Sequence, residues 1–263
     1  VQAMPLDSYP LGSLLVILFV GVSIWGAMLV RRITGIKKLV SHHEVMGYFF
    51  PVAGSTYGIL LGLVVVNSIT IFDEARSIVN NEATNLVEIY SLANFLPKDK
   101  SIAIQSLCRD YADSIVDHEW DQMHEGVNYM PSREYTIELF NQITSTLEKG
   151  YPVSQKMLDL LEEMWKERRN RVDLASRHIP TVEWVALCLG GVLVVVFSYM
   201  FVMDSLVVQL FGTAVISTMI GLNIFLILLF ANPFSGDLHV SDKPFRNAID
   251  NFSTIDKIKA ASK

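Results

Sequence analysis

The sequence has little that would support an enzyme, a disulfide scaffold or a nucleic-acid-binding protein. Cysteine occurs only twice in 263 residues, at Cys108 and Cys188. One lies in a polar segment and the other in a hydrophobic run, so we expect neither a disulfide nor a cysteine metal site. The net charge of −6 gives no reason to expect nucleic acid as a partner. Gly-x-Ser-x-Gly, phosphate-binding glycine loops and His-Glu-x-x-His are all absent, which predicts a protein that is not an enzyme and has no cofactor.

Charged residues are also missing from four long stretches of the chain, although hydrophobic residues make up 51% of it. These stretches are Leu11–Val30, Val45–Phe72, Trp184–Met203 and Ser205–Gly236. Each reaches the roughly 20 residues that a helix needs to cross about 30 Å of hydrocarbon. The sequence therefore predicts an all-α integral membrane protein with four transmembrane helices, whose first partner is the lipid bilayer.

The polar segments divide this membrane protein into four parts. We expect a first pair of transmembrane helices over 1–72, a helical extramembrane domain over 73–180, a second transmembrane hairpin over 181–236 and a C-terminal tail over 237–263. The segment 73–180 shows helical periodicity throughout and no strong alternation of the kind that strands require. Glycine and proline are absent between Leu63 and Leu96, so the second span should continue without a break into the extramembrane domain.

The basic residues beside the spans predict two opposite orientations of the protein in the membrane. Arg31 and Arg32 follow the first span directly, which would place that short loop in the cytoplasm and the extramembrane domain outside. A second basic cluster precedes the third span and would place the domain in the cytoplasm. This cluster consists of Lys166, Arg168, Arg169, Arg171 and Arg177. Charge alone therefore leaves the orientation of the domain open.

The second span carries a stripe of residues at alternating spacings of three and four, most of them polar. The stripe consists of Thr56, Leu60, Leu63, Asn67, Thr70, Glu74, Ser77, Asn81, Thr84 and Glu88. This spacing keeps one side of a helix turned toward a partner or a symmetry axis. Roughly opposite lie Gly54, Gly58 and Gly62, whose spacing lets another helix approach closely.

One interpretation of the stripe is a homo-oligomeric ion channel, in which copies of the second span surround a pathway for inorganic ions. Leu60 and Leu63 would form an apolar constriction and Glu74 a charged ring at one mouth, with polar residues lining the wall between them. Acidic side chains at that mouth, namely Asp73, Glu74 and Glu82, would favour cations. The equally plain interpretation is that the stripe beyond Asp73 is the solvated side of a helix outside the membrane.

A second functional hypothesis is a membrane scaffold or sensor that does not conduct. Its helical domain would bind a partner or ligand and relay the signal through the continuous second helix. A weak metal candidate lies in the same domain, where Asp117, Asp121 and His124 or Glu125 could share one helical side near Glu119. Because acidic clusters of this kind are usually solvated surface, we expect no metal site there.

Several short motifs, taken in order, resemble the bestrophin-like family of bacterial and plant membrane proteins. They are the glycine-rich second span followed by Asn81-Glu82-Ala83, then Leu96-Pro97, Tyr111, Glu119-Trp120, Arg168, Arg169 and Arg171, Pro233-Phe234-Ser235-Gly236 and Pro244-Phe245. The resemblance implies kinship with bestrophins, which are oligomeric ion channels whose second span lines the pore. It also implies a bacterial inner (cytoplasmic) membrane, with both termini and the domain in the cytoplasm. No segment matches a bestrophin calcium clasp or its aromatic neck, so Leu60 and Leu63 would have to form the constriction.

Overall fold

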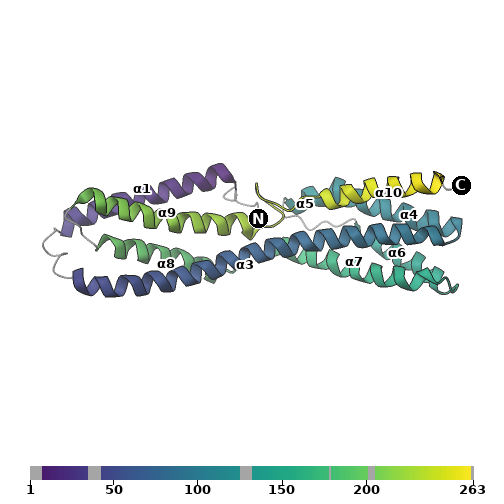
Figure 1. The fold of residues 1–263 in the computed structure, drawn as a ribbon, viewed down its shortest axis with the longest axis horizontal. Coiled ribbons are helices and arrows are strands. Elements are labelled where there is room, and N and C mark those ends of the chain that lie inside the picture. The colour runs from purple at the N-terminus through teal and green to yellow at the C-terminus, as the bar shows by residue number, and fades with distance from the viewer. Residues whose placement is uncertain (1–7, 35–42, 125–131, 178, 201–204, 262–263) are drawn as a thin grey trace.

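The computed structural model describes residues 8–34, 43–124, 132–177, 179–200 and 205–261, and every regular element within these ranges is helical. Figure 1 shows an elongated molecule made of two helical bundles placed end to end, with one long helix, α3, running through both. The all-α prediction is confirmed. Each bundle has its own hydrophobic core, and α3 contributes to the two cores with successive parts of its length.

The first bundle contains the four helices that are long and apolar enough to cross a membrane. They are α1 (Tyr9–Thr34), the first part of α3 (His43–Leu92), α8 (Thr181–Tyr199) and α9 (Leu206–Ala231). Its core is small and includes Tyr57, Leu61, Leu187 and Val195, whereas most of its other apolar side chains are exposed. Exposed apolar surface on this scale suits contact with lipid. The prediction of four transmembrane helices is confirmed.

Close packing between α3 and α8 depends on two adjacent glycines. The Tyr57 ring of α3 lies so close to α8 that a Cβ atom on Gly190 would be 2.5 Å from Tyr57 Cδ2. The Tyr57 hydroxyl then donates a hydrogen bond of 3.0 Å to the carbonyl oxygen of Leu187. The small residues of α8 therefore fix the rotation of α3 inside the membrane bundle.

Gly190→Ala is expected to destabilise the membrane bundle by about 1–3 kcal/mol, because the added methyl group has no space beside Tyr57. Thermal unfolding of the purified protein in detergent measures this loss. Gly212→Ala is the matched control, since no atom of the described chain lies within 4 Å of a Cβ there. Equal melting temperatures for the two variants would contradict the prediction.

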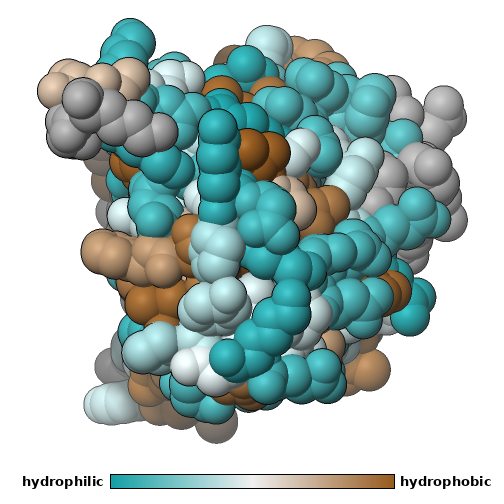
Figure 2. Space-filling model, turned by 90° about the vertical axis from the view of Figure 1, so that its right-hand side faces the viewer, coloured by the Kyte–Doolittle hydropathy of each residue, from teal (hydrophilic) through white to brown (hydrophobic). Residues whose placement is uncertain are grey.

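The second bundle lies outside the apolar part of the molecule and surrounds the second part of α3. Its members are η2 (Ala93–Phe95), α4 (Lys98–Ser114), η3 (Ile115–Glu119), α5 (Trp120–His124), α6 (Ser132–Leu147), α7 (Val153–Ser176) and α10 (Lys243–Ala261). Fully buried side chains such as Leu86, Ile104, Leu139 and Met157 form its core. Figure 2 looks onto the end of this bundle, where hydrophilic residues cover most of the surface and apolar residues lie between them.

The chain after the fourth span turns back onto the second bundle. Gly236 has a φ of 77°, a conformation that favours glycine, and the Val240 amide donates a 2.8 Å hydrogen bond to the carbonyl of Pro233. Beyond this turn α10 buries Phe245 and Phe252 against α3 and α4. The predicted tail thus contains a helix that belongs to the extramembrane core.

The continuity of α3 connects the membrane bundle to the extramembrane bundle and positions the candidate functional site. The helix extends over 50 residues, which corresponds to roughly 75 Å at the rise of an α-helix. It ends in the short η2 helix, just before Pro97. The predicted unbroken passage from membrane to extramembrane domain is confirmed, because neither glycine nor proline interrupts the helix after Gly62.

Candidate functional site

Among the described residues, α3 packs against the rest of its chain along one side. Its buried residues recur at spacings of three and four and include Tyr57, Leu61, Val64, Ser68, Ala75 and Val79. The opposite side is exposed from the membrane bundle into the extramembrane bundle. We call this exposed side the outward face of α3. The outward face extends along both bundles and is open to contact with lipid, water or another protein.

All of the predicted stripe lies on the outward face. Thr56, Leu60, Leu63, Asn67, Thr70, Glu74, Ser77, Asn81, Thr84 and Glu88 are each exposed. The hydroxyls of Thr56 and Thr70 donate to carbonyls one turn earlier, at 2.8 and 2.9 Å, and so are satisfied within the helix. Asn67 has no such partner among the described residues, and a bare amide exposed to lipid is costly. The side-chain amide of Asn67 therefore needs a hydrogen-bond partner from water or from another protein.

The three glycines of α3 lie at the edge of the outward face that is farthest from the polar stripe, roughly 160° around the helix from it. No atom of the described chain lies within 4 Å of a Cβ built on Gly54, Gly58 or Gly62. This differs from Gly190 of α8, which is packed tightly inside the chain. No described residue of the same copy packs on the three glycines, so the predicted partner helix would have to come from another copy.

Exposed apolar side chains lie in the first part of the stripe and on the surface of α3 beside it. Leu63 is 66% exposed, and so is Ile59, while Val66 is 62% exposed. Leu60, which the sequence pattern selects with Leu63, is less exposed at 38%. Ile59, Leu63 and Val66 follow the spacing of four and three that places residues on one side of a helix. The sequence pattern selected Leu60 and Leu63 but not Ile59 and Val66, although the same helical spacing identifies these two residues.

Acidic side chains begin where α3 leaves the membrane bundle. Asp73 and Glu74 are both exposed, and neither forms a salt bridge within the described residues. Glu82 was expected to join them at the mouth of a pathway, and this expectation was wrong. Its side chain is fully buried, because eight residues rotate the helix far enough to turn Glu82 toward the bundle core.

Glu82 is instead the centre of a buried ion pair that joins α3 to α7. Arg171 Nε lies 2.8 Å from Glu82 Oε2, and Arg171 Nη2 lies 3.0 Å from Glu82 Oε1. The Tyr111 hydroxyl donates a third hydrogen bond to Glu82 Oε1, at 2.5 Å. Burial by itself would lower the pKa of Arg171, but the Glu82 carboxylate raises it above its ordinary value. Burial and the neighbouring Glu82 charge both raise the pKa of Tyr111, so the phenol stays a donor.

A second buried carboxylate extends the cluster. Glu119 Oε2 lies 3.1 Å from Arg171 Nη2, and Glu119 Oε1 lies 3.6 Å from Arg168 Nη2. Glu119 Oε1 also accepts a 2.9 Å hydrogen bond from the backbone amide of Ser132, at the start of α6. The Ser132 hydroxyl in turn accepts a 2.9 Å hydrogen bond from Arg168 Nε. Two carboxylates and two guanidinium groups thus compensate one another away from water.

Aromatic rings close this cluster on the side of α10. The Arg171 guanidinium lies 6.0 Å from the Trp120 ring centroid and 5.9 Å from that of Phe245. Trp120 meets Phe234 and Phe245 edge to face, at 5.9 and 6.2 Å between centroids. Elements distant in sequence therefore meet around Arg171.

Comparison with known proteins identifies the family and finds the same fold in solved structures. The family model of the Bestrophin-like domain matches residues 17–245. The chain belongs to the Bestrophin-like family. A structure of a bacterial Bestrophin homologue from Klebsiella pneumoniae is similar with a TM-score of 0.69 and 16% identity, covering 91% of this chain and 97% of that one.

Two further solved structures show the same fold. A point mutant of the Klebsiella pneumoniae homologue has a TM-score of 0.69 and 17% identity, over 91% of this chain and 98% of the other. A structure described only as a mutant membrane protein has a TM-score of 0.70 and 16% identity, with the same coverage. A comparison with curated proteins found no match.

Residues from most of the motifs that carry the resemblance to the Bestrophin-like family meet in the buried cluster. Glu82, Tyr111, Glu119, Trp120, Arg168, Arg171, Phe234 and Phe245 all take part in the contacts described above. The residues matched by the Bestrophin-like domain end at Phe245, one of the rings over Arg171. The motifs thus mark the contact that joins α3 to the extramembrane bundle.

The weak metal candidates of the Bestrophin-like domain lie on its surface. Asp117 and Asp121 are exposed at η3 and α5, while the side chain of His124 lies outside the described residues. Glu119, which is close in sequence, is turned inward onto Arg171 and Arg168. Within the described ranges, no group of three histidine, cysteine or acidic side chains gathers as metal ligands would.

Proposed function

We propose that the protein is a homo-oligomeric ion channel in which copies of the outward face of α3 surround the pathway. The observation that carries this proposal is the exposed stripe on α3, with Asn67 at membrane depth and without a partner among the described residues. Lipid would leave that amide unsatisfied, whereas a water-filled pathway between copies would hydrate it. The bacterial origin of the similar solved structures supports a bacterial inner membrane as its location.

The different parts of the outward face take different roles in this channel. The edge with Gly54, Gly58 and Gly62 would meet the helix of a neighbouring copy, because it is free of side chains and unpacked. Leu63, with Ile59 or Val66 beside it, would form the apolar constriction. Hydrophobic constrictions control ion flow by expelling water.

The mouth next to the extramembrane bundle would favour cations. Each copy contributes Asp73 and Glu74, both exposed, to a ring at this level. Rings of acidic side chains attract cations and raise their local concentration. Glu82 adds nothing to this ring, since it is neutralised by Arg171 inside the bundle.

Glu74→Gln is expected to reduce cation preference, because it removes one negative charge per copy from the ring. In a planar bilayer under a salt gradient, the reversal potential of the variant should move toward zero relative to the wild type. Glu138→Gln serves as the control, since Glu138 is exposed on α6, away from α3. Reversal potentials that do not differ would remove Glu74 from the mouth. A protein that stays monomeric in mild detergent would favour the scaffold or sensor over the channel.

A further inference from the structure

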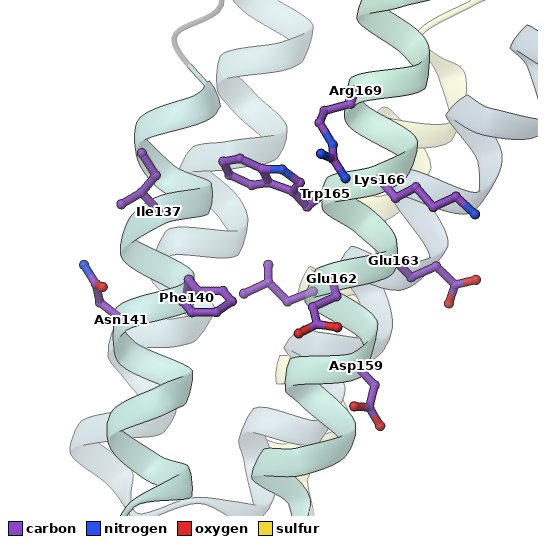
Figure 3. A pocket seen from close by; sticks show the side chains of 10 residues that line it. Ile137, Phe140, Asn141, Asp159, Glu162, Glu163, Trp165, Lys166 and Arg169 are labelled. Atoms are coloured by element: carbon purple, nitrogen blue, oxygen red, sulfur yellow. The ribbon is translucent and has the colours of Figure 1, made fainter.

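The extramembrane bundle exposes an apolar groove between α6 and α7. The groove has a volume of about 780 Å³. Its floor includes Ile137 and Phe140 from α6 and Leu161 and Trp165 from α7. Figure 3 shows Trp165 and Phe140 in the space between the two helices, with Lys166 on the far side of α7 from α6. Asp159 and Glu163 also lie on the side of α7 away from α6 in Figure 3.

We propose that α7 and this groove receive α10 of the next copy in the oligomer, an inference that rests on the proposed function. In the extramembrane bundle these two helices lie on different sides of α3, with α10 above it and α7 below it in Figure 1. Glu82 of α3 pairs with Arg171 of α7, whereas Tyr90 of α3 stacks on Phe252 of α10 at 4.2 Å between ring centroids. The outward face lies between these two sides, so a ring of copies around that face brings α7 of one copy beside α10 of another.

One contact relates the positions of α7 and α10 along the long axis of the bundle. We call the position of a residue along this axis its height. Arg171 of α7 and Phe245 of α10 lie together, 5.9 Å from guanidinium carbon to ring centroid. Lys166 is five residues from Arg171 and Asp250 is five residues from Phe245, each in the direction away from the membrane bundle. Both therefore lie about 7.5 Å beyond that contact. Rotation about an axis parallel to α3 preserves height, so Lys166 of one copy can meet Asp250 of the next.

A second pair of opposite charges also lies at equal heights on α7 and α10. Asp159 of α7 and Lys257 of α10 lie twelve residues from Arg171 and Phe245 respectively, about 18 Å beyond the shared contact. On each helix the two charges are seven residues apart, which places them on one side. The order is basic then acidic on α7, and acidic then basic on α10. The two surfaces are thus complementary at both heights.

All four charged side chains are available for such a contact. Lys166, Asp159, Asp250 and Lys257 are exposed, and none forms a salt bridge within the described residues. The buried side of α10 is formed by Phe245, Ala248 and Phe252. Asp250 and Lys257 lie on the other side of that helix by the 100° rotation per residue. Ile258, next to Lys257, is exposed and would find apolar cover at the groove.

Cysteine cross-linking tests this contact directly. The chain carrying both Lys166→Cys and Asp250→Cys should form a ladder of covalent multimers with a short bismaleimide, because each copy links to the next. Either substitution alone should give no ladder, since the contact joins two different surfaces. The wild type is the background control, because Cys108 is buried and Cys188 lies in a membrane helix.

Charge reversal gives a second measurement on the same purified protein. Lys166→Asp and Asp250→Lys should each reduce the oligomer fraction measured by native mass spectrometry severalfold, and the double variant should restore it. Asp110→Lys, at an exposed position of α4 outside the proposed contact, should leave the fraction unchanged. An intact oligomer without a ladder and without a charge effect would overturn this interface and leave the channel proposal standing. A monomeric wild type would overturn both.

Discussion

Arg171→Met is expected to destabilise the extramembrane bundle by about 3–5 kcal/mol. The substitution keeps most of the side-chain volume but leaves Glu82 and Glu119 buried without the guanidinium that compensates them. An uncompensated buried carboxylate either takes up a proton or draws water into the core, and each route costs free energy. Chemical unfolding of the detergent-solubilised protein, followed by circular dichroism, measures the loss.

The exposed neighbour Arg169 supplies the matched control. Arg169→Met removes the same charge two residues away, where the side chain forms no salt bridge within the described residues, and should change stability by less than about 1 kcal/mol. Combining Arg171→Met with Glu82→Gln and Glu119→Gln should recover part of the loss, because no buried charge then lacks a partner. Similar losses for Arg171→Met and Arg169→Met would contradict the assignment of the cluster as the main electrostatic contact of the bundle.

The same cluster has a consequence for the proposed channel. Glu82 belongs to α3, so its two hydrogen bonds with Arg171 fix the rotation of α3 about its own axis. In the membrane bundle, Tyr57 against Gly190 fixes the same rotation a second time. These two contacts together determine which side of α3 faces outward and therefore which residues could line a pathway.

Leu63→Ser is expected to increase the current at a fixed voltage severalfold or more. A hydroxyl in place of an isobutyl group widens and wets the apolar constriction, and water can then accompany the ion through it. Single-channel or macroscopic recording in planar bilayers gives the measurement. Val66→Ser should act in the same direction, because Val66 shares the outward face with Leu63.

Leu193→Ser on α8 controls for the effect of a serine in a membrane helix. Leu193 is also a largely exposed leucine, but it belongs to a helix that would face lipid in the proposed channel. Its substitution should leave the current unchanged. Equal currents for the wild type and the Leu63 variant would place the constriction elsewhere, and a rise in the Leu193 variant as large as that in Leu63→Ser would point to disrupted packing.

Much of this architecture could be predicted from local patterns. The uncharged runs identified the four spans, because lipid excludes charge over the length of a membrane helix. The absence of glycine and proline after Gly62 predicted the unbroken α3, and the spacing of three and four placed Asn67, Thr70 and Glu74 on one side of it. These features depend on helix geometry and transfer into lipid, which act within one segment and need no knowledge of its neighbours.

The structure alone decided how these segments are used. Glu82 looked like another member of an acidic mouth, yet Arg171 and Tyr111, far along the chain, draw it into the core. The spacing of the α3 glycines predicts close helix packing, yet among the described residues it is Gly190 of α8 that lies against another helix, at Tyr57. The sequence by itself determined which segments are helices and which enter the membrane. Only the tertiary structure decided which side of each helix is buried, because that choice depends on distant side chains that no local spacing contains.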